Sequence, residues 1–342
     1  MKKRYREIGE TGKVIRLIIL LIFEGYISGY SQGIEFSKPT INGNIKTKLE
    51  YATETGMTRF SVRNSRALLS GTISDIVLYK GQIELSDEGE FRVLDLNASI
   101  RFFDGLTVTL GQTSLPFFNS YAINPGDLMF SNRPFLGKYF TPTRDIGILG
   151  TYRSGWDNFP VSVEFGVFNG STINNPIWTD KPSYATRIQL GGMTGFRTTA
   201  KFYRYPLSDQ QDYTFWGVDA RYAGSNYNIE TEVMHRYNDF DGVNRISLYV
   251  QGSYTFPVRN PGIIKSVTPA LRWDSIGENL GNGMFDNNRA TFGVAFGLTE
   301  KPFKSLFRIN YEHYMVNNAI PEFLERREIA SDKLTFEILV VF

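Results

Sequence analysis

From residue 41 onward, the chain consists of short segments in which apolar and polar side chains alternate, separated by residues typical of turns. In one such segment Phe196, Ala200 and Phe202 alternate with Arg197 and Lys201. Successive side chains of a β-strand point to opposite faces, so each segment predicts a strand with one apolar and one polar face. No amphipathic helix pattern of comparable clarity follows, and the expected fold class is all-β.

The number of these segments favours a barrel. Bacterial single-chain outer-membrane barrels have an even number of strands. The alternation predicts about sixteen strands, starting near Ile41, Arg59, Ile76, Arg92, Leu106, Arg144, Val161, Tyr184, Phe196, Tyr213, Tyr227, Arg245, Ser266, Arg289, Ser305 and Lys333.

The lengths of the connections separate a membrane barrel from a soluble sandwich. Membrane barrels have short turns on the periplasmic side and longer loops outside. If the first strand runs outward, the even-numbered connections near residues 71–75, 103–105, 153–160, 191–195 and 223–226 are the periplasmic ones, and they are short. The longest connections are odd-numbered and span residues 114–143, 170–183, 277–287 and 316–331. We therefore predict a transmembrane antiparallel β-barrel with its long loops on the extracellular side.

The last segment places Leu334, Phe336, Ile338 and Val340 on one face and ends at Phe342. A chain that ends in an alternating strand with a terminal phenylalanine is similar to those that the barrel-insertion machinery of Gram-negative bacteria recognises. We expect Phe342 to be part of the membrane insertion signal.

Composition agrees with membrane-spanning strands. Aromatic residues make up 15% of the chain, with 27 Phe and 19 Tyr, and barrels carry aromatic girdles at both interfaces. Beyond the first few dozen residues no apolar run approaches the ~20 residues that a spanning helix needs. The chain has no Cys, which fits an oxidising compartment and removes thiolate chemistry.

The amino terminus has the order of regions found in a secretory signal peptide. Basic residues between Lys2 and Arg16 precede the apolar run 17–23, and small residues follow up to Ser31. The run is too short to span a bilayer. We expect residues 1–31 to be a signal peptide, residues 32–40 an N-terminal periplasmic segment, and residues 41–342 the barrel in the outer membrane of a Gram-negative bacterium. A buried helix or strand is the alternative for the apolar run.

The predicted inner face carries charge of both signs. Export would remove six basic and three acidic residues and change the net charge from +2 to −1, so a basic footprint for nucleic acid is missing. A tightly packed interior would need close pairing of its ions, so the sequence favours a wide, water-filled lumen. The lumen-lining charges that we single out are Lys46, Lys48, Arg101, Arg187, Arg197, Lys201, Arg221, Arg272, Glu230 and Glu232.

The second predicted strand breaks the alternation. Arg63 and Arg66 are three positions apart and cannot share one face of a regular strand. A β-bulge between them would restore the phase.

Several short motifs resemble the phosphate-selective porin O and P family of outer-membrane channels. They are Leu110-Gly111-Gln112 followed by Leu115-Pro116-Phe117, Arg144-Asp145-Ile146-Gly147-Ile148, Phe165-Gly166-Val167-Phe168-Asn169-Gly170, Asn310-Tyr311-Glu312 and the terminal Phe342. The similarity covers most of residues 40–342.

The resemblance implies a porin, which can assemble as a homotrimer, whose third extracellular loop folds inward and narrows the pore. In this sequence that constriction loop is 114–143, with Asp127, Arg133 and Lys138 inside it and Arg144 next to it. Rings of charged side chains set selectivity in pores, so Arg133, Lys138 and Arg144 are candidates for a cationic constriction. The alternative is that they hold the loop to the wall by pairing with residues such as Asp127 and Asp145. The loop contains one lysine rather than a cluster, so the sequence predicts only weak charge preference.

Motifs typical of enzymes and of calcium sites are incomplete or out of place in this sequence. Gly29-Tyr30-Ser31-Gln32-Gly33 matches a nucleophile elbow, but it lies across the expected cleavage site rather than between a strand and a helix. The two histidines, His235 and His313, have no serine at a telling spacing, which leaves a barrel lipase as a remote alternative. A calcium loop starting at Asp239 lacks its bidentate Glu, because Val250 stands at that position.

Aromatic residues near strand ends suit an interface girdle better than a sugar-binding track. These residues are Tyr51, Tyr152, Tyr222, Tyr254, Trp273 and Tyr311. The sequence thus predicts a porin that passes small hydrophilic or anionic solutes by passive diffusion, with no catalysis, cofactor or metal. The expected partners are outer-membrane lipid, lipopolysaccharide and the barrel-insertion machinery. The alternative is a non-channel barrel, either a secretion-system accessory or a surface-binding protein, with loops that plug the lumen.

Overall fold

The computed structural model describes residues 38–117, 125–140, 143–155, 159–208, 211–259, 262–278, 285–299, 304–318 and 331–342. The expected signal peptide, most of the expected periplasmic segment and the elbow-like motif lie outside these ranges. In the part of the chain that the structure describes, no helix is both long and apolar enough to cross a membrane.

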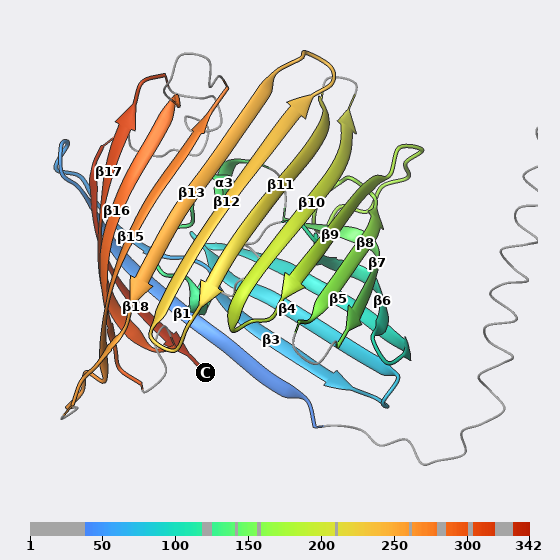
Figure 1. Ribbon diagram of the computed structural model, residues 1–342, viewed down its shortest axis with the longest axis horizontal. Coiled ribbons are helices and arrows are strands. Elements are labelled where there is room, and N and C mark those ends of the chain that lie inside the picture. The colour runs from blue at the N-terminus through green and yellow to red at the C-terminus, as the bar shows by residue number, and fades with distance from the viewer. Residues whose placement is uncertain are drawn as a thin grey trace, which may run out of the picture. The chain divides into compact units, whose positions relative to one another are not determined.

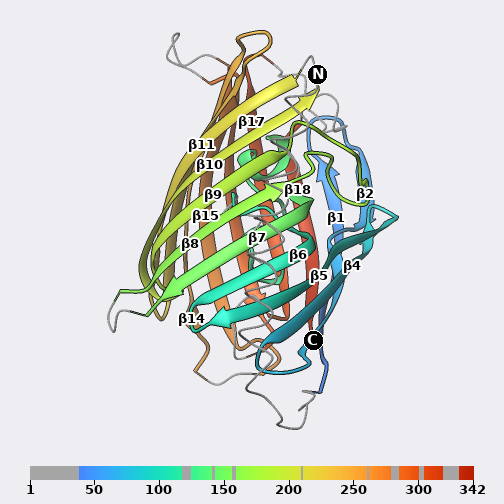
Figure 2. The same cartoon turned by 90° about the vertical axis from the view of Figure 1, so that its right-hand side faces the viewer.

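The described strands form one antiparallel sheet that closes on itself, as Figures 1 and 2 show from two directions. The strands pair in order around the barrel, and the first strand, β1, pairs with the last, β18, from Asn44↔Val341 to Ala52↔Lys333. Closure satisfies the backbone groups that an open sheet edge would leave unpaired, which is what a sheet needs in lipid.

A strand begins within two residues of each of the sixteen predicted starts, and two further segments begin at Ser65 and Phe256, where the alternation predicts none. The bounds of the strands are β1 Thr40–Ala52, β2 Thr58–Val62, β3 Ser65–Thr72, β4 Val77–Asp87, β5 Glu90–Phe103, β6 Leu106–Ser114, β7 Arg144–Ser154, β8 Val161–Phe168, β9 Ser183–Gly191, β10 Gly195–Ser208, β11 Gln211–Ala223, β12 Tyr227–Asn238, β13 Asn244–Tyr254, β14 Phe256–Pro257, β15 Ser266–Gly277, β16 Asn287–Gly297, β17 Leu306–Val316 and β18 Lys333–Val341.

Two of the barrel strands are interrupted, which reconciles eighteen strand segments with a sixteen-stranded barrel. β2 and β3 both pair with β1, and β13 and β14 both pair with β15. The first interruption falls at Arg63 and Asn64, where Asn64 has a φ of 54°. The irregularity predicted between Arg63 and Arg66 is therefore present, and the prediction of a sixteen-stranded antiparallel barrel is confirmed.

The two faces of the wall differ as the alternation predicts. On β1, Lys46, Lys48 and Glu50 are buried inside, whereas Ile41 and Ile45 are 68% and 48% exposed on the outside. The last strand keeps this phase, since Glu337 is buried and Ile338 is 52% exposed.

Phe342 lies where the last strand meets the first. Its backbone N–H donates to the Gly43 carbonyl at 2.9 Å, and the Gly43 N–H donates to the Phe342 carbonyl at 2.8 Å. A Cβ placed on Gly43 would lie 2.5 Å from the Phe342 ring and 2.6 Å from the Arg66 carbonyl oxygen. Only glycine allows this close approach of three chain segments at the closing seam.

Candidate functional site

Residues 125–140, the described middle part of the predicted constriction loop 114–143, lie inside the barrel. Its described part contains a short 3₁₀ turn, η1 (Pro125–Asp127), and one helical turn, α3 (Leu136–Tyr139). Both views place α3 within the ring of strands (Figures 1 and 2). Most side chains of residues 125–140 are buried, although the barrel around them has a largely polar inner face.

Cationic side chains of the wall hold the loop by its backbone carbonyls. The wall donors and the carbonyl acceptors, with their N···O distances, are Lys46 Nζ to Ser131 at 2.6 Å, Arg272 Nη1 to Asn132 at 2.8 Å, Arg289 Nη2 to Arg133 at 2.7 Å, Arg308 Nη1 to Leu128 at 2.6 Å and Arg236 Nη1 to Phe140 at 3.0 Å. Hydrogen bonds from charged donors contribute more than neutral ones. One side of the barrel wall therefore holds the loop by hydrogen bonds, because the donors come from β1, β12, β15, β16 and β17.

Acidic and amide groups of the same wall accept hydrogen bonds from the loop. The Phe135 N–H donates to Asp274 Oδ2 at 2.8 Å, and the Ser131 N–H donates to Asn310 Oδ1 at 2.8 Å. Asn132 Nδ2 donates to Glu312 Oε2 at 2.9 Å. The loop is thus bonded through both its donors and its acceptors, which fixes its conformation against the wall.

A cluster of apolar side chains from the loop and the wall also holds the loop in place. Phe117, Phe135, Leu136 and Phe140 of the loop are at most 3% exposed and pack with wall residues that include Phe215. The Phe117 ring lies 5.5 Å from the Phe215 ring, edge to face. Burial of four such side chains contributes roughly 6–12 kcal/mol before the entropy of ordering is subtracted.

The ions beneath the loop are paired and almost inaccessible to water. Arg289 Nη2 lies 2.7 Å from Asp274 and its Nη1 lies 2.8 Å from Glu312, with all three side chains at most 2% exposed. Lys201 lies 2.6 Å from Asp219, and both are fully buried. The expectation of a wide, water-filled interior is therefore wrong for this side of the barrel, because the alternation identifies the inner face but not what covers it.

The predicted lumen-lining residues all lie on the inner face but differ in access to solvent. Buried inner-face residues are Lys46, Lys48, Arg197, Lys201, Arg272, Glu230 and Glu232. Arg187 and Arg221 are 18% and 16% exposed, and Arg101 is exposed near the β5–β6 turn.

The three cations of the predicted constriction, Arg133, Lys138 and Arg144, lie in different surroundings. Arg144 lies on the wall, where its Nε is 2.7 Å from Asp95 and its Nη2 donates to Gln82 at 3.1 Å. Arg133 is buried in the loop. Lys138 lies in α3, and its side chain is outside the described set.

The described contacts of Asp145 are with backbone groups. The Asp145 carboxylate accepts the N–H groups of Ile146 and Gly170 at 2.7 and 2.8 Å. Asp127 lies in η1, where burial raises the pKa of its carboxyl, although the charges of Lys304 and Arg221 oppose the shift.

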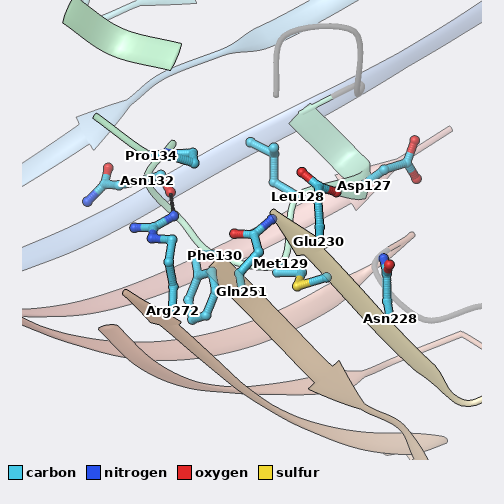
Figure 3. A pocket seen from close by; sticks show the side chains of 10 residues that line it. All are labelled: Asp127, Leu128, Met129, Phe130, Asn132, Pro134, Asn228, Glu230, Gln251 and Arg272. Carbon is cyan, nitrogen blue, oxygen red and sulfur yellow. Dashed lines mark hydrogen bonds between the residues drawn. The ribbon is translucent and has the colours of Figure 1, made fainter. Parts of the chain in front are cut away.

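A small pocket lies between the loop and the wall formed by β12, β13 and β15 (Figure 3). Loop residues Asp127 and Phe130, Glu230 of β12 and Arg272 of β15 are among the residues that line it. Both walls carry polar atoms, but the pocket is shallow and its Arg272 is already bonded to the Asn132 carbonyl. We regard it as a recess of the lumen beside the loop.

The opposite side of the barrel has small inner side chains that solvent reaches. On β5, β6 and β7 these partly exposed inner positions are Asn97, Ser99, Thr107, Thr109, Gly111, Gly147 and Thr151. Basic side chains stand among them, of which Lys80 is 41% exposed and Arg153 is exposed. Lys80 and Arg153 are not among the predicted lumen residues, although their phase in the alternation places them on the inner face.

The two histidines lie on the outer face. His235 stacks on Trp216 with ring centroids 5.1 Å apart, and its Nε2 lies 2.9 Å from Asn244 Oδ1. His313 Nδ1 lies 2.7 Å from Asp332 Oδ2. In the described residues no serine hydroxyl is hydrogen-bonded to either imidazole. Within the same ranges no group of three His, Asp or Glu side chains could hold a metal ion.

The aromatic residues predicted as a girdle all face outward. Their exposed fractions are between 38% and 45% for Tyr51, Tyr152, Tyr222, Tyr254, Trp273 and Tyr311. Side chains in these positions meet the surroundings of the barrel rather than a solute inside it.

The fold is that of outer-membrane porins. OmpF of Salmonella typhi, solved in complex with daunomycin, superimposes with a TM-score of 0.64 at 15% identity, covering 92% of this chain and 99% of that one. An anion-selective porin from Comamonas acidovorans gives a TM-score of 0.61 at 13% identity, covering 90% of this chain and all of the other. The outer membrane channel DcaP of Acinetobacter baumannii gives a TM-score of 0.58 at 13% identity, with 91% and 100% coverage. At these identities the likeness concerns the fold.

No protein-family model matches the chain, and no curated protein matches it in sequence.

Proposed function

We propose that this protein is an outer-membrane porin through which small hydrophilic solutes diffuse passively. The observation that carries the proposal is the asymmetry of the lumen. The loop fills the side of β12–β18 and β1, whereas the inner positions of β5, β6 and β7 carry small polar residues or glycine and remain accessible. A polar wall with short side chains beside an inward-folded loop leaves a path for water and solutes.

Three features support the outer-membrane assignment. The outer face is apolar, the closed sheet leaves no free edge, and the structural neighbours are described as outer-membrane porins or channels. Cell fractionation and sequencing of the mature amino terminus test the assignment. Recovery in the outer-membrane fraction with cleavage near Ser31 is the expected result, and an uncleaved protein elsewhere in the cell would contradict it.

The channel itself is tested by planar-bilayer recording. Purified protein that migrates as a folded barrel is expected to add stepwise, ohmic currents to the bilayer. The same preparation unfolded by heat is the control and should add none. Absence of steps from folded protein would favour the second candidate, a barrel plugged by its loops, which the burial of the wall beneath the constriction loop makes reasonable.

Membership of the phosphate-selective porin O and P family is the finer part of the proposal. Its support is the set of short motifs, and its test is the chloride current in the presence of phosphate. Added phosphate is expected to block the chloride current of a phosphate-binding channel, and a current that phosphate leaves unchanged would remove the finer assignment while leaving the porin in place.

Partners and catalysis complete the proposal. We propose contacts with outer-membrane lipid and lipopolysaccharide, assembly by the barrel-insertion machinery, a homotrimeric state and no enzymatic activity. Mass measurement in detergent tests the trimer, and a monomer under conditions that preserve known trimers would contradict it.

A further inference from the structure

The connection between β8 and β9, residues 169–182, presents an apolar tip to its surroundings, and we call this segment the rim arm. Its Trp178 is fully exposed and has the largest exposed fraction of any large apolar side chain in the part of the chain that the structure describes. The adjacent Ile177 is 44% exposed. Single exposed apolar residues are common on protein surfaces, so the way the arm is attached decides what its tip contacts.

The base of the rim arm is attached on the inner side of the wall. The Gly170 N–H donates to Asp145 Oδ2 at 2.8 Å. Asp145 is 1% exposed and is opposite in phase to Ile148, which is 46% exposed on the outer face. Thr172 and Asn174 have φ values of 74° and 58°, so the backbone turns sharply where the arm leaves this attachment.

The middle of the rim arm is attached to β5 and β6. The Asn174 N–H donates to Gln112 Oε1 at 2.7 Å, and Asn174 Nδ2 donates to the Val93 carbonyl at 3.1 Å. Gln112 Nε2 in turn donates to the carbonyls of Val93 and Leu94 at 2.8 and 2.9 Å. Leu94 is the extra residue of a β-bulge, since Val93 and Asp95 pair with consecutive residues of β4. These bonds hold Asn174 at a fixed place on the rim.

Gln112 lies on the outer face of the wall. It pairs with Leu96 of β5 and follows Leu110 by two residues, and these leucines are 64% and 66% exposed. Paired residues, and residues two apart in a strand, share a face. The rim arm therefore crosses the rim between the inner Asp145 and the outer Gln112, and its tip, four residues after Asn174, continues outside the ring of strands. Figure 1 shows the connection extending past the ends of β8 and β9.

The attachment point is level with the end of the apolar outer face. Phe91, two residues from Val93 in β5, is 63% exposed, and Leu85 at the same end of β4 is 45% exposed. The hairpin that joins these strands carries charged residues, Asp87, Glu88 and Glu90. The rim arm has the same order, since Asp180 and Lys181 follow its apolar tip. A boundary between apolar and charged side chains marks the membrane–water interface, where tryptophan is enriched.

We propose that the rim arm docks onto the membrane around the barrel, with Ile177 and Trp178 inserted at the boundary between head groups and acyl chains of the extracellular leaflet. The inference rests on the proposed outer-membrane location and assigns a lipid-binding surface that solute diffusion does not need. Tryptophan suits this boundary because its ring buries apolar area while its N–H keeps a polar partner. An arm already held by Asp145 and Gln112 loses little conformational entropy when its tip inserts.

Site-directed spin labelling tests this placement, because the chain contains no Cys and each single-cysteine variant carries one label. A label at Thr179→Cys reports on the tip while Trp178 stays in place. Leu110→Cys is the lipid-facing reference, and Asp241→Cys, in the exposed turn between β12 and β13, is the water-facing reference. The folded protein is measured in phosphatidylcholine vesicles, as the ratio of collisions with lipid-soluble oxygen to collisions with a water-soluble nickel chelate.

The ratio at Thr179→Cys is expected to be at least about threefold above that at Asp241→Cys. Adding Trp178→Ser should bring it down to the water-facing value, whereas the matched control Trp178→Phe should keep most of it. A ratio equal to that of Asp241→Cys, or one that Trp178→Ser leaves unchanged, overturns the proposal. A label shielded from both reagents also overturns it, and shielding that grows with the protein-to-lipid ratio would identify a second copy as the partner.

The reference label and the conductance separate this proposal from the porin. Trp178→Ser should leave the single-channel conductance unchanged, because the tip lies outside the barrel. A water-exposed tip on a conducting channel overturns the lipid-binding arm and leaves the porin standing. A Leu110→Cys label in contact with water in the folded protein overturns the membrane location, and with it both proposals.

Discussion

Replacement of Arg289 by Met should release the constriction loop from the wall. Arg289 donates to both oxygens of Asp274 at 3.0 and 2.7 Å, to Glu312 at 2.8 Å and to the Arg133 carbonyl at 2.7 Å. Its guanidinium also lies 4.5 Å from the centre of the Phe135 ring. Methionine keeps part of the volume but removes the charge, these hydrogen bonds and a further one from Nη1 to the Tyr314 hydroxyl at 3.2 Å.

The magnitude follows from what the substitution leaves behind. Asp274 and Glu312 are 1% exposed, so two carboxylates would stay buried, with Arg272 as the cation that still contacts both, at 3.4 and 3.5 Å. Removal of one partner from a buried ion pair costs about 3–5 kcal/mol. Because the loop is bonded to this network and the strands are bonded to one another, we expect the loop to open at lower denaturant concentration than the barrel.

Two measurements check this prediction. Proteolysis in increasing urea reports opening of the loop, and single-channel recording should show a larger and noisier conductance for the variant. The control is the double variant Arg289→Met, Glu312→Gln, which removes one cation and one anion, leaves Asp274 in contact with Arg272, and should recover part of the lost stability. If Arg289→Met alters neither loop protection nor conductance, the network does not hold the loop and the reasoning fails.

Further predictions concern the seam and the outer face. Gly43→Val should lower the yield of heat-resistant barrel in detergent, because the new side chain overlaps the Phe342 ring; a normal yield would argue against that fit. Deletion of Phe342 should slow assembly in reconstituted insertion assays relative to wild type, and equal rates would contradict its role as a signal. Burial alone would raise the pKa of Asp332, but hydrogen bonds, including one from His313, hold its pKa below the usual range. The ionised Asp332 carboxylate should therefore stabilise the fold above pH ~4, and this stabilisation should fade as the pH falls through the lowered pKa. Asp332→Asn should therefore destabilise the barrel at pH ~7, and in urea titrations its difference from the wild type should shrink as the pH falls below ~4; a pH-independent effect would contradict the assignment. Lipid turnover that is lost in His235→Ala or His313→Ala would revive the barrel lipase, and we expect no turnover in the wild type.

The strands were readable from the sequence because a membrane barrel repeats one local rule. Each strand needs an apolar outer face and a polar inner face, so the start at Tyr227 or at Lys333 is fixed by side chains within a few positions. The sequence also predicts the irregularity in the second strand, because Arg63 and Arg66 are three positions apart and would point to opposite faces of a regular strand.

The interior was harder to predict because its state depends on contacts between distant residues. Nothing near Lys46 in the chain indicates that its ammonium group bonds the carbonyl of Ser131, 85 positions away. Arg289 and Glu312 fit equally well as water-exposed pore charges until the loop covers them. The sequence favours Arg133 as a selectivity residue because it lies in the predicted constriction loop, whereas the structure buries Arg133 and exposes Arg153 on the wall.

The central claim is that this barrel conducts, and single-channel recording in a planar bilayer tests it most directly. Folded, purified protein should insert and produce discrete, repeatable current steps that heat-unfolded protein does not produce. Folded protein that inserts into the bilayer and carries no current would show that the loop closes the lumen completely, and the porin function would be refuted.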